Sequence, residues 1–120
     1  MPRTRFWSRL RPCVSRNISI LAKSKSAIAE HLENRAVLRL RGDETSVFLQ
    51  GLITNDMRHL EEGARSMYAM FLNTKGRVMY DAIVYRTQDD GTFLVECDKL
   101  AVSNLVKHLK MFRVRRNIEI

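Results

Sequence analysis

The strongest constraint on the fold is a pair of apolar runs that flank a very short glycine-containing connection. Residues 66–73 read SMYAMFLN and residues 77–85 read RVMYDAIVY, and only the sequence TKG separates them. Such a connection is typical of a β-hairpin, in which successive side chains point to opposite faces of the sheet. We therefore expect the chain to be built around an antiparallel hairpin.

Three further segments have the pattern of strands. Residues 35–42 alternate apolar and basic side chains, and residues 92–97 form another short apolar run after the turn sequence TQDDG. Residues 113–120 alternate once more, with Val114, Ile118 and Ile120 in apolar positions. Alternation of this kind predicts strands.

Two segments are predicted to form helices, 43–54 and 99–111, because their apolar residues recur at helical spacing. Asp43 and Asp98 stand at their starts, where a short carboxylate can accept hydrogen bonds from free backbone N–H groups. The order β-α-β-β-β-α-β predicts an α+β fold with two helices covering an antiparallel sheet. The predicted buried helix positions are Val47, Phe48, Leu52, Ile53, Leu100, Leu105, Val106 and Leu109.

Asp81 interrupts the apolar run 77–85. Alternation places it on one face of the strand with Ile83 and Tyr85, and Tyr68 joins that face if the hairpin register suits. An ionised carboxylate among apolar side chains is costly unless it is paired or hydrogen-bonded.

Two interpretations of Asp81 are open. Asp81 either lies at the base of an aromatic-walled pocket, where it binds a nitrogen-rich ring or transfers protons, or it is structural. In the structural case it pairs with Arg77 or Arg86, or accepts bonds from backbone N–H groups. The polar residues within 49–56 present a similar choice between the mouth of a ligand site and an ordinary helix end. The cysteines and histidines have no metal-ligand spacing, and Cys97 has the character of a small buried residue.

The positive charge of the chain is concentrated at its beginning. Residues 1–29 contain seven of the 21 basic residues and no acidic residue, which leaves 14 basic against 13 acidic residues in the rest. An Arg-rich, acid-free leader is typical of a mitochondrial transit peptide, although a basic tail for RNA or anionic lipid has the same composition. We therefore predict a transit peptide over 1–29 and a folded body over 30–120, without a membrane-spanning segment.

Three stretches of the body together resemble the N-terminal part of the folate-binding YgfZ/GcvT family. They read LRLRGDETSVFLQGLITNDMRHL, YAMFLNTKGRVMYDAIVY and FLVECD followed by LVKHLKMFRVRRNIEI, and they extend over roughly residues 35–120. The resemblance is nearest to the branch of mitochondrial iron–sulfur cluster assembly factors. It implies a protein of the mitochondrial matrix that matures [4Fe–4S] proteins together with A-type scaffold proteins.

The resemblance also implies a ligand, tetrahydrofolate. The acid that contacts the pterin ring in the aminomethyltransferase branch falls on Asp81, the folate-contacting tyrosines fall on Tyr68 and Tyr85, and a hydrophobic contact falls on Ile83. Tyr80 replaces the first acid of that branch's pair, which favours the assembly branch. The cysteine motif KGCYxGQE of the assembly branch has no counterpart in this sequence, so the chain resembles an N-terminal fragment and no cluster ligand is assigned.

Two other functions are kept as alternatives. The first is a tetrahydrofolate-dependent aminomethyltransferase of the glycine cleavage system, in which Asp81 would be catalytic. The second is a binding module for RNA or an acidic protein that uses the basic run Lys107, Lys110, Arg113, Arg115 and Arg116.

Overall fold

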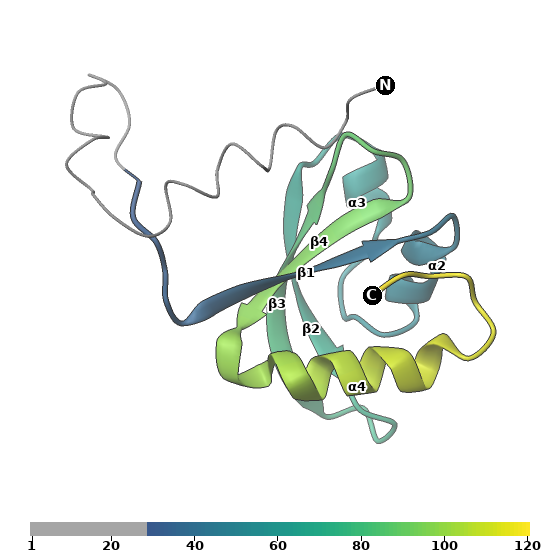
Figure 1. Cartoon of the computed structure of the whole chain (residues 1–120). Coiled ribbons are helices and arrows are strands. Elements are labelled where there is room, and N and C mark those ends of the chain that lie inside the picture. Colours follow the sequence, from purple (N-terminus) through teal and green to yellow (C-terminus); the bar gives the residue numbers. More distant parts are fainter. Residues whose placement is uncertain (1–28) are drawn as a thin grey trace. The chain divides into compact units, whose positions relative to one another are not determined.

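The computed structural model describes residues 29–120, so nearly all of the predicted transit peptide lies outside the described residues. Within residues 29–120, the secondary structure consists of four strands, three α-helices and one 3₁₀ helix (Figure 1). In chain order these are β1 (Arg35–Arg41), α2 (Thr45–Gln50), α3 (Arg58–Glu61), β2 (Ser66–Leu72), β3 (Val78–Arg86), β4 (Thr92–Asp98), η3 (Lys99–Ala101) and α4 (Val102–Arg113).

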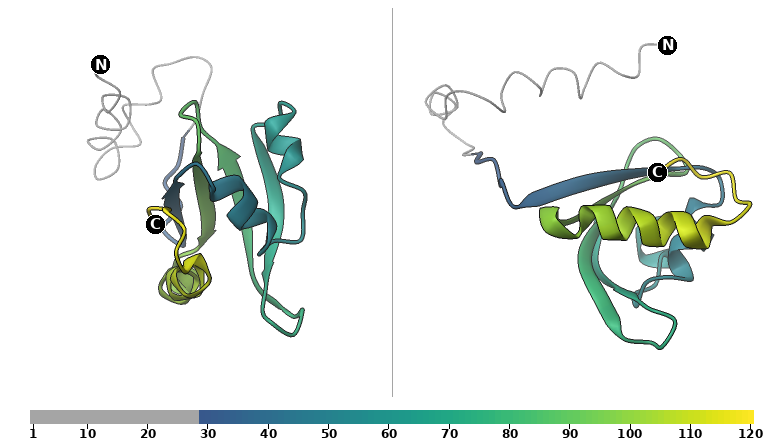
Figure 2. Two further views of the ribbon diagram at one scale, coloured as in Figure 1. Left: turned by 90° about the vertical axis from the view of Figure 1, so that its right-hand side faces the viewer. Right: turned by 60° about the horizontal axis from the view of Figure 1, so that its bottom comes forward.

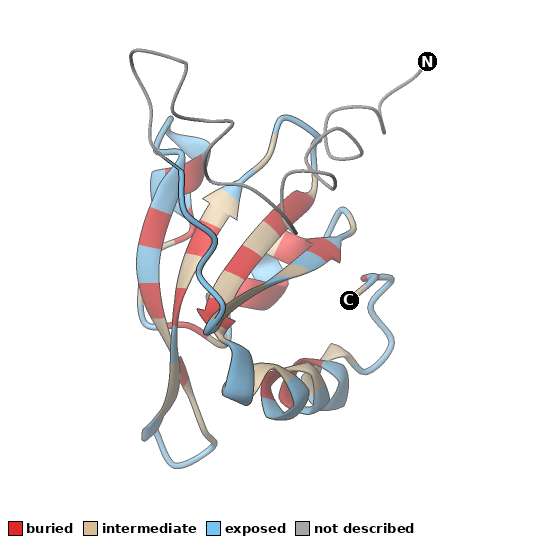
Figure 3. Ribbon diagram, turned by 60° about the vertical axis from the view of Figure 1, so that its left-hand side comes forward, coloured by how far each residue is buried: buried red, intermediate tan, exposed pale blue. Residues whose placement is uncertain are grey.

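The four strands form one antiparallel sheet in the order β1-β4-β3-β2. The hairpin between β2 and β3 confirms the prediction from the TKG connection, and the predicted α+β class is confirmed. Buried residues alternate with half-buried or exposed ones along the strands, as Figure 3 shows. This alternation gives the sheet two faces of different character.

The inner face of the sheet carries the core. Every α-helix contributes buried side chains to it, which are Phe48 and Leu49 from α2, Leu60 from α3, and Leu105 and Leu109 from α4. Each such side chain stabilises the fold by about 1.5–3 kcal/mol relative to an exposed position. The strands contribute Leu40, Met67, Ala69, Phe71, Ala82, Val84, Phe93, Val95 and Cys97.

The opposite face of the sheet is the outer face, and no helix or strand of residues 33–120 covers it. Val37 and Tyr68 on this face are 57% and 55% exposed. The outer face consists of Arg35, Val37, Arg39, Leu94, Glu96, Asp81, Ile83, Tyr85, Tyr68 and Met70.

The prediction of a final strand over 113–120 is wrong. This segment makes a single bridge, in which Arg41 and Glu119 exchange two backbone hydrogen bonds of 3.0 and 2.8 Å. The chain reverses its direction after α4 in a turn centred on Val114, which has φ 50° and ψ −110°. The Arg116 N–H closes this turn by donating to the Arg113 carbonyl. These angles are typical of the first central position of a type II′ turn. Because the turn occupies the start of the predicted strand, extended backbone on the β1 edge begins only near Ile118. The returning segment then lies beside α2 (Figures 1 and 2). There the Arg116 guanidinium lies 5.8 Å from the centre of the Phe48 ring.

The predicted helix bounds need correction: α2 ends at Gln50 and not at residue 54, and α4 begins at Val102 and not at residue 99. Asp43 is not the N-cap of α2: Glu44 occupies that position, and its side chain makes no capping bond. Val47 is 69% exposed and Leu100 is 91% exposed, although both were predicted to be buried. Leu100 lies in η3, where the tighter 3₁₀ turn removes it from the apolar face of α4. The capping role of Asp98 is confirmed, because its carboxylate accepts a hydrogen bond from the Leu100 N–H.

The segment between α2 and α3 closes the β2 edge of the sheet. The Thr54 N–H donates to the Met70 carbonyl at 3.0 Å, and the Thr54 hydroxyl accepts from the Met70 N–H at 3.2 Å. The Asn55 amide donates to the Tyr68 carbonyl at 3.0 Å. Since an open strand edge is a template for aggregation, these bonds protect β2.

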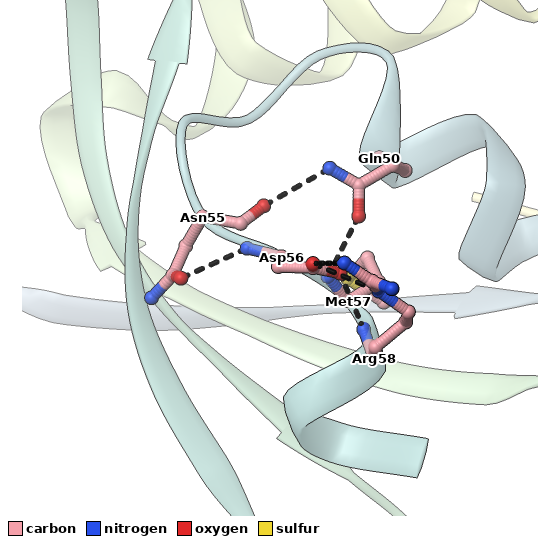
Figure 4. A network of polar contacts seen from close by, with 5 residues as sticks. All are labelled: Gln50, Asn55, Asp56, Met57 and Arg58. Carbon is pink, nitrogen blue, oxygen red and sulfur yellow. Dashed lines mark hydrogen bonds and ion pairs between the residues drawn. The ribbon is translucent and has the colours of Figure 1, made fainter. Parts of the chain in front are cut away.

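A network of polar contacts fixes that segment (Figure 4). The Gln50 amide donates to the Asn55 carbonyl and accepts from the Met57 N–H at 2.7 Å. The Asp56 carboxylate accepts two bonds from the Arg58 guanidinium and one from its N–H. These bonds hold the pKa of Asp56 at about 2, below its ordinary value. Asn55 thus has a structural role at the strand edge.

Candidate functional site

The four predicted site residues lie on the outer face of the sheet. Tyr68 on β2 is directly opposite Ile83 on β3, and Asp81 is opposite Met70. Tyr85 follows two residues after Ile83 on the same face. The period of the strands therefore brings Tyr68, Asp81 and Ile83 together, with Tyr85 beyond them.

Asp81 is exposed, whereas the sequence predicted a carboxylate among apolar side chains. Its nearest polar side-chain contact is the Tyr68 hydroxyl, 3.5 Å from Oδ2. It has no ion pair with either predicted partner among residues 29–120. Arg86 instead donates to the backbone carbonyls of Leu60 and Glu61. The open outer face removes the desolvation cost that made Asp81 appear anomalous.

Tyr85 belongs to a second polar group on the same face. Its hydroxyl donates a 2.6 Å hydrogen bond to Oε2 of Glu96, and the Arg35 guanidinium bonds Oε1 at 2.9 Å. The bond from Tyr85, followed by that from Arg35, lowers the pKa of Glu96. The same bond raises the pKa of Tyr85, because the carboxylate favours the protonated hydroxyl. Glu96 is thus ionised at neutral pH, and each of its carboxylate oxygens accepts a hydrogen bond.

The distance between these two groups limits what the face can bind. Asp81 and Tyr85 are four residues apart on β3, which corresponds to about 13 Å along the strand. Ile83 lies between them, directly opposite both Tyr68 and Glu96 on the neighbouring strands. A ligand that contacts all four predicted residues must therefore be elongated and lie along β3.

The outer face is exposed to solvent at Asp81, Tyr68 and Val37. Two hollows of the described surface lie elsewhere, and Asp81, Tyr68 and Tyr85 line neither of them. One hollow lies between the β3–β4 turn and the start of α2, and the other lies between Gly42 and Asn117. The exposed outer face can thus act as one wall of a site.

Arg35 and Glu96 lie on this face, but they are not among the site residues predicted from the sequence. Alternation in the run TFLVEC predicts that Glu96 lies on the face that points away from the core, together with Leu94. Its pairing with Arg35 depends on β1 and β4 being neighbours, since the two residues are 61 positions apart. No local pattern in the sequence reports such a pairing.

The basic run after residue 106 is partly engaged within the fold. Arg113 donates to the Ile118 carbonyl at 2.9 Å, and Arg116 lies over the Phe48 ring. Cys97 is fully buried, as predicted, and burial is the main cause of its raised pKa. None of the helices within residues 29–120 has the length and hydropathy needed to cross a membrane.

Comparison with known proteins finds relatives that are named as mitochondrial iron–sulfur cluster assembly factors. The chain is 33% identical over 123 aligned residues to the mouse (Mus musculus) iron–sulfur cluster assembly factor IBA57, mitochondrial, which covers 90% of this chain and 34% of the relative. It is 38% identical to the human (Homo sapiens) protein of that name, over 74% of this chain and 28% of the relative. The homologue of Neosartorya fischeri is also 38% identical, over 74% of this chain and 23% of the relative.

No family model matches the chain. The chain spans between about a quarter and a third of the length of these relatives. Their names agree with the predictions of a mitochondrial protein and of iron–sulfur cluster assembly. Over most of its own length, the chain is thus similar to one part of the mitochondrial iron–sulfur cluster assembly factor IBA57.

Proposed function

We propose that this chain is part of a mitochondrial matrix protein that assists the maturation of [4Fe–4S] proteins. The observation that carries the proposal is the 38% identity to the human assembly factor over 74% of the chain. The proposed organisation is a transit peptide over 1–29 followed by a GcvT/YgfZ-like folate-binding region over 30–120. A-type iron–sulfur scaffold proteins are its proposed partners.

We further propose that the outer face forms one wall of a site for a tetrahydrofolate-type ligand. The chemistry of the face fits one side of such a molecule. Asp81 offers a carboxylate for ring N–H groups, Tyr68 and Ile83 offer flat and apolar surface beside it, and Tyr85 lies about 13 Å further along β3. When bound, tetrahydrofolate carries one-carbon units, and the described residues here only bind and orient it.

The cellular role is tested by depleting the protein and measuring aconitase activity together with glycine cleavage. Loss of aconitase activity, restored by the wild-type gene, is the expected result, because aconitase carries a [4Fe–4S] cluster. Normal aconitase with failed glycine cleavage would overturn the assembly role and favour the aminomethyltransferase. Glycine cleavage is not informative alone, since its lipoyl cofactor is made by a [4Fe–4S] enzyme.

The ligand site is tested separately by equilibrium binding of tetrahydrofolate to the protein. Asp81→Asn is expected to weaken binding by about tenfold or more, since a hydrogen bond to a charged group contributes about 1.5–3 kcal/mol. Tyr68→Phe keeps the ring and is expected to have a smaller effect. Equal binding by the wild type and Asp81→Asn would remove the role of Asp81 without affecting the proposed cellular function.

A further inference from the structure

The two edge strands of the sheet, β1 and β2, differ in how far their outward backbone groups are hydrogen-bonded. The segment 52–55 covers the β2 edge with backbone and side-chain hydrogen bonds. At the β1 edge, the Arg41–Glu119 bridge is the only backbone pairing found on the outer side within residues 29–120. Most of the β1 edge is therefore left open by the described residues.

The bridge fixes which backbone groups of β1 point outward. Both the N–H and the carbonyl of Arg41 bond Glu119, so they point away from β4. In an antiparallel ladder this direction alternates along the strand, so the backbone groups of Arg39, Val37 and Arg35 also point outward. Those of Leu38 and Leu40 point toward β4, as does the N–H of Gly42, which bonds the Gly91 carbonyl at 3.0 Å.

The last two residues already have the chemistry of a strand on this edge. Glu119 extends toward the outer face, where its Oε1 lies 3.3 Å from the Arg39 guanidinium. Ile120 packs against the core, and in the register of the bridge it comes opposite Leu40. Beyond it, Leu38 and Ala36 are only half-buried on the inner face, and Val37 is 57% exposed on the outer face. An acidic or polar residue opposite Arg39 and apolar residues opposite Leu38 and Ala36 would complete the pattern.

We propose that β1 is an acceptor edge for a fifth antiparallel strand. Its occupant is the polypeptide that follows this region in a protein as long as the relatives, of which the mouse protein is matched over only 34% of its length. This strand continues the register from Glu119 and Ile120, alternating polar residues opposite Arg39 and Val37 with apolar residues opposite Leu38 and Ala36. The inference does not depend on the proposed function.

Amide hydrogen exchange, measured by NMR, tests the proposal on the 120-residue chain and on the same chain lengthened by eight residues that alternate threonine and valine in this register. In the 120-residue chain, the Val37 and Arg39 amides are expected to exchange at least about tenfold faster than those of Leu38 and Leu40. Lengthening is expected to slow Val37 and Arg39 by a similar factor. The matched control is an extension with the alternation shifted by one residue, which places valine on the wrong face and is expected to give no protection.

A substitution makes the test specific to the edge. Val37→Pro removes an outward N–H and leaves the bonds to β4 in place, so the 120-residue chain is expected to keep its fold. In the lengthened chain the same substitution is expected to abolish protection of Arg39, whereas Val37→Thr is expected to retain it. Unchanged exchange on lengthening would overturn the proposal. Protection that rises with concentration in the 120-residue chain would also overturn it, by assigning the edge to a second copy.

Discussion

The Tyr85 hydroxyl donates a 2.6 Å hydrogen bond to Glu96 across neighbouring strands, whereas the Tyr68 hydroxyl lies 3.5 Å from Asp81 at an exposed position. The two tyrosines therefore differ in strength of contact although they share one face. The first contact is part of a half-buried ionic group that includes Arg35. The second leaves both partners accessible to a ligand.

Replacement of the two tyrosines by phenylalanine is expected to separate these roles. Tyr85→Phe removes a bond to a carboxylate and is expected to lower the free energy of unfolding by about 1–2 kcal/mol. Tyr68→Phe, the matched control on the same face, is expected to change it by less than about 0.5 kcal/mol. Urea denaturation of both variants measures the difference, and equal effects would contradict this assignment.

The stability of the fold is expected to fall in acid because of Glu96. Its pKa is lowered from an ordinary 4.5, so the folded state holds the charged form more strongly than the unfolded state does. This contribution is complete above pH 4.5, where both states are ionised, and is lost as the pH falls through the folded-state pKa. Denaturation curves at a series of pH values measure the loss.

Glu96→Gln provides the control for that pH dependence. The variant is expected to be less stable than the wild type at neutral pH, and the gap is expected to narrow as the pH falls. Asp56, with a pKa of about 2, remains present in both proteins and cancels in the comparison. Parallel curves for the two proteins would contradict the role of Glu96.

His108 gives a second pH dependence, of different origin. It is only 7% exposed on α4 and its ring lies 4.8 Å from that of Phe112. Within residues 29–120 its Nε2 has no hydrogen-bond partner, and burial lowers its pKa from 6.5. As the pH falls below 6.5, the unfolded chain binds a proton first, so stability is lost down to the folded-state pKa.

His108→Leu is expected to raise the free energy of unfolding by about 1 kcal/mol at neutral pH, because it removes an unsatisfied buried polar atom. The gain is expected to grow as the pH falls below 6.5. Thermal unfolding at several pH values measures both effects. A gain that is independent of pH would show that His108 is not protonated preferentially in the unfolded state.

Gly42 and Gly51 are expected to respond to alanine in opposite directions. A Cβ atom at Gly42 would clash with the Asn117 carbonyl oxygen, so Gly42→Ala forces the returning C-terminal segment away. A loss of about 1–3 kcal/mol is expected. Gly51 has φ −75°, and a Cβ atom there would lie 3.5 Å from the Phe48 carbonyl oxygen, which is an ordinary contact. Gly51→Ala is therefore expected to stabilise the fold by up to about 1 kcal/mol. Chemical denaturation of both variants measures the effects, and a neutral Gly42→Ala would contradict the close approach.

The sequence by itself determined the features that depend on local period. Alternation placed Asp81, Ile83 and Tyr85 on one face of β3, and the TKG connection determined the hairpin that brings Tyr68 beside them. Helical spacing identified Leu105 and Leu109 as buried. These features follow from the backbone geometry of each segment, which depends on residues a few positions apart.

Only the tertiary structure decided which strands are neighbours and which face is covered. The placement of α2, α3 and α4 on the inner face leaves Asp81 exposed, and the neighbouring positions of β1 and β4 join Arg35 to Glu96. The turn at Val114 likewise decided that residues 113–120 meet β1 at Glu119 alone. These outcomes depend on contacts between residues far apart in the chain, and the local pattern of side chains carries no information about them.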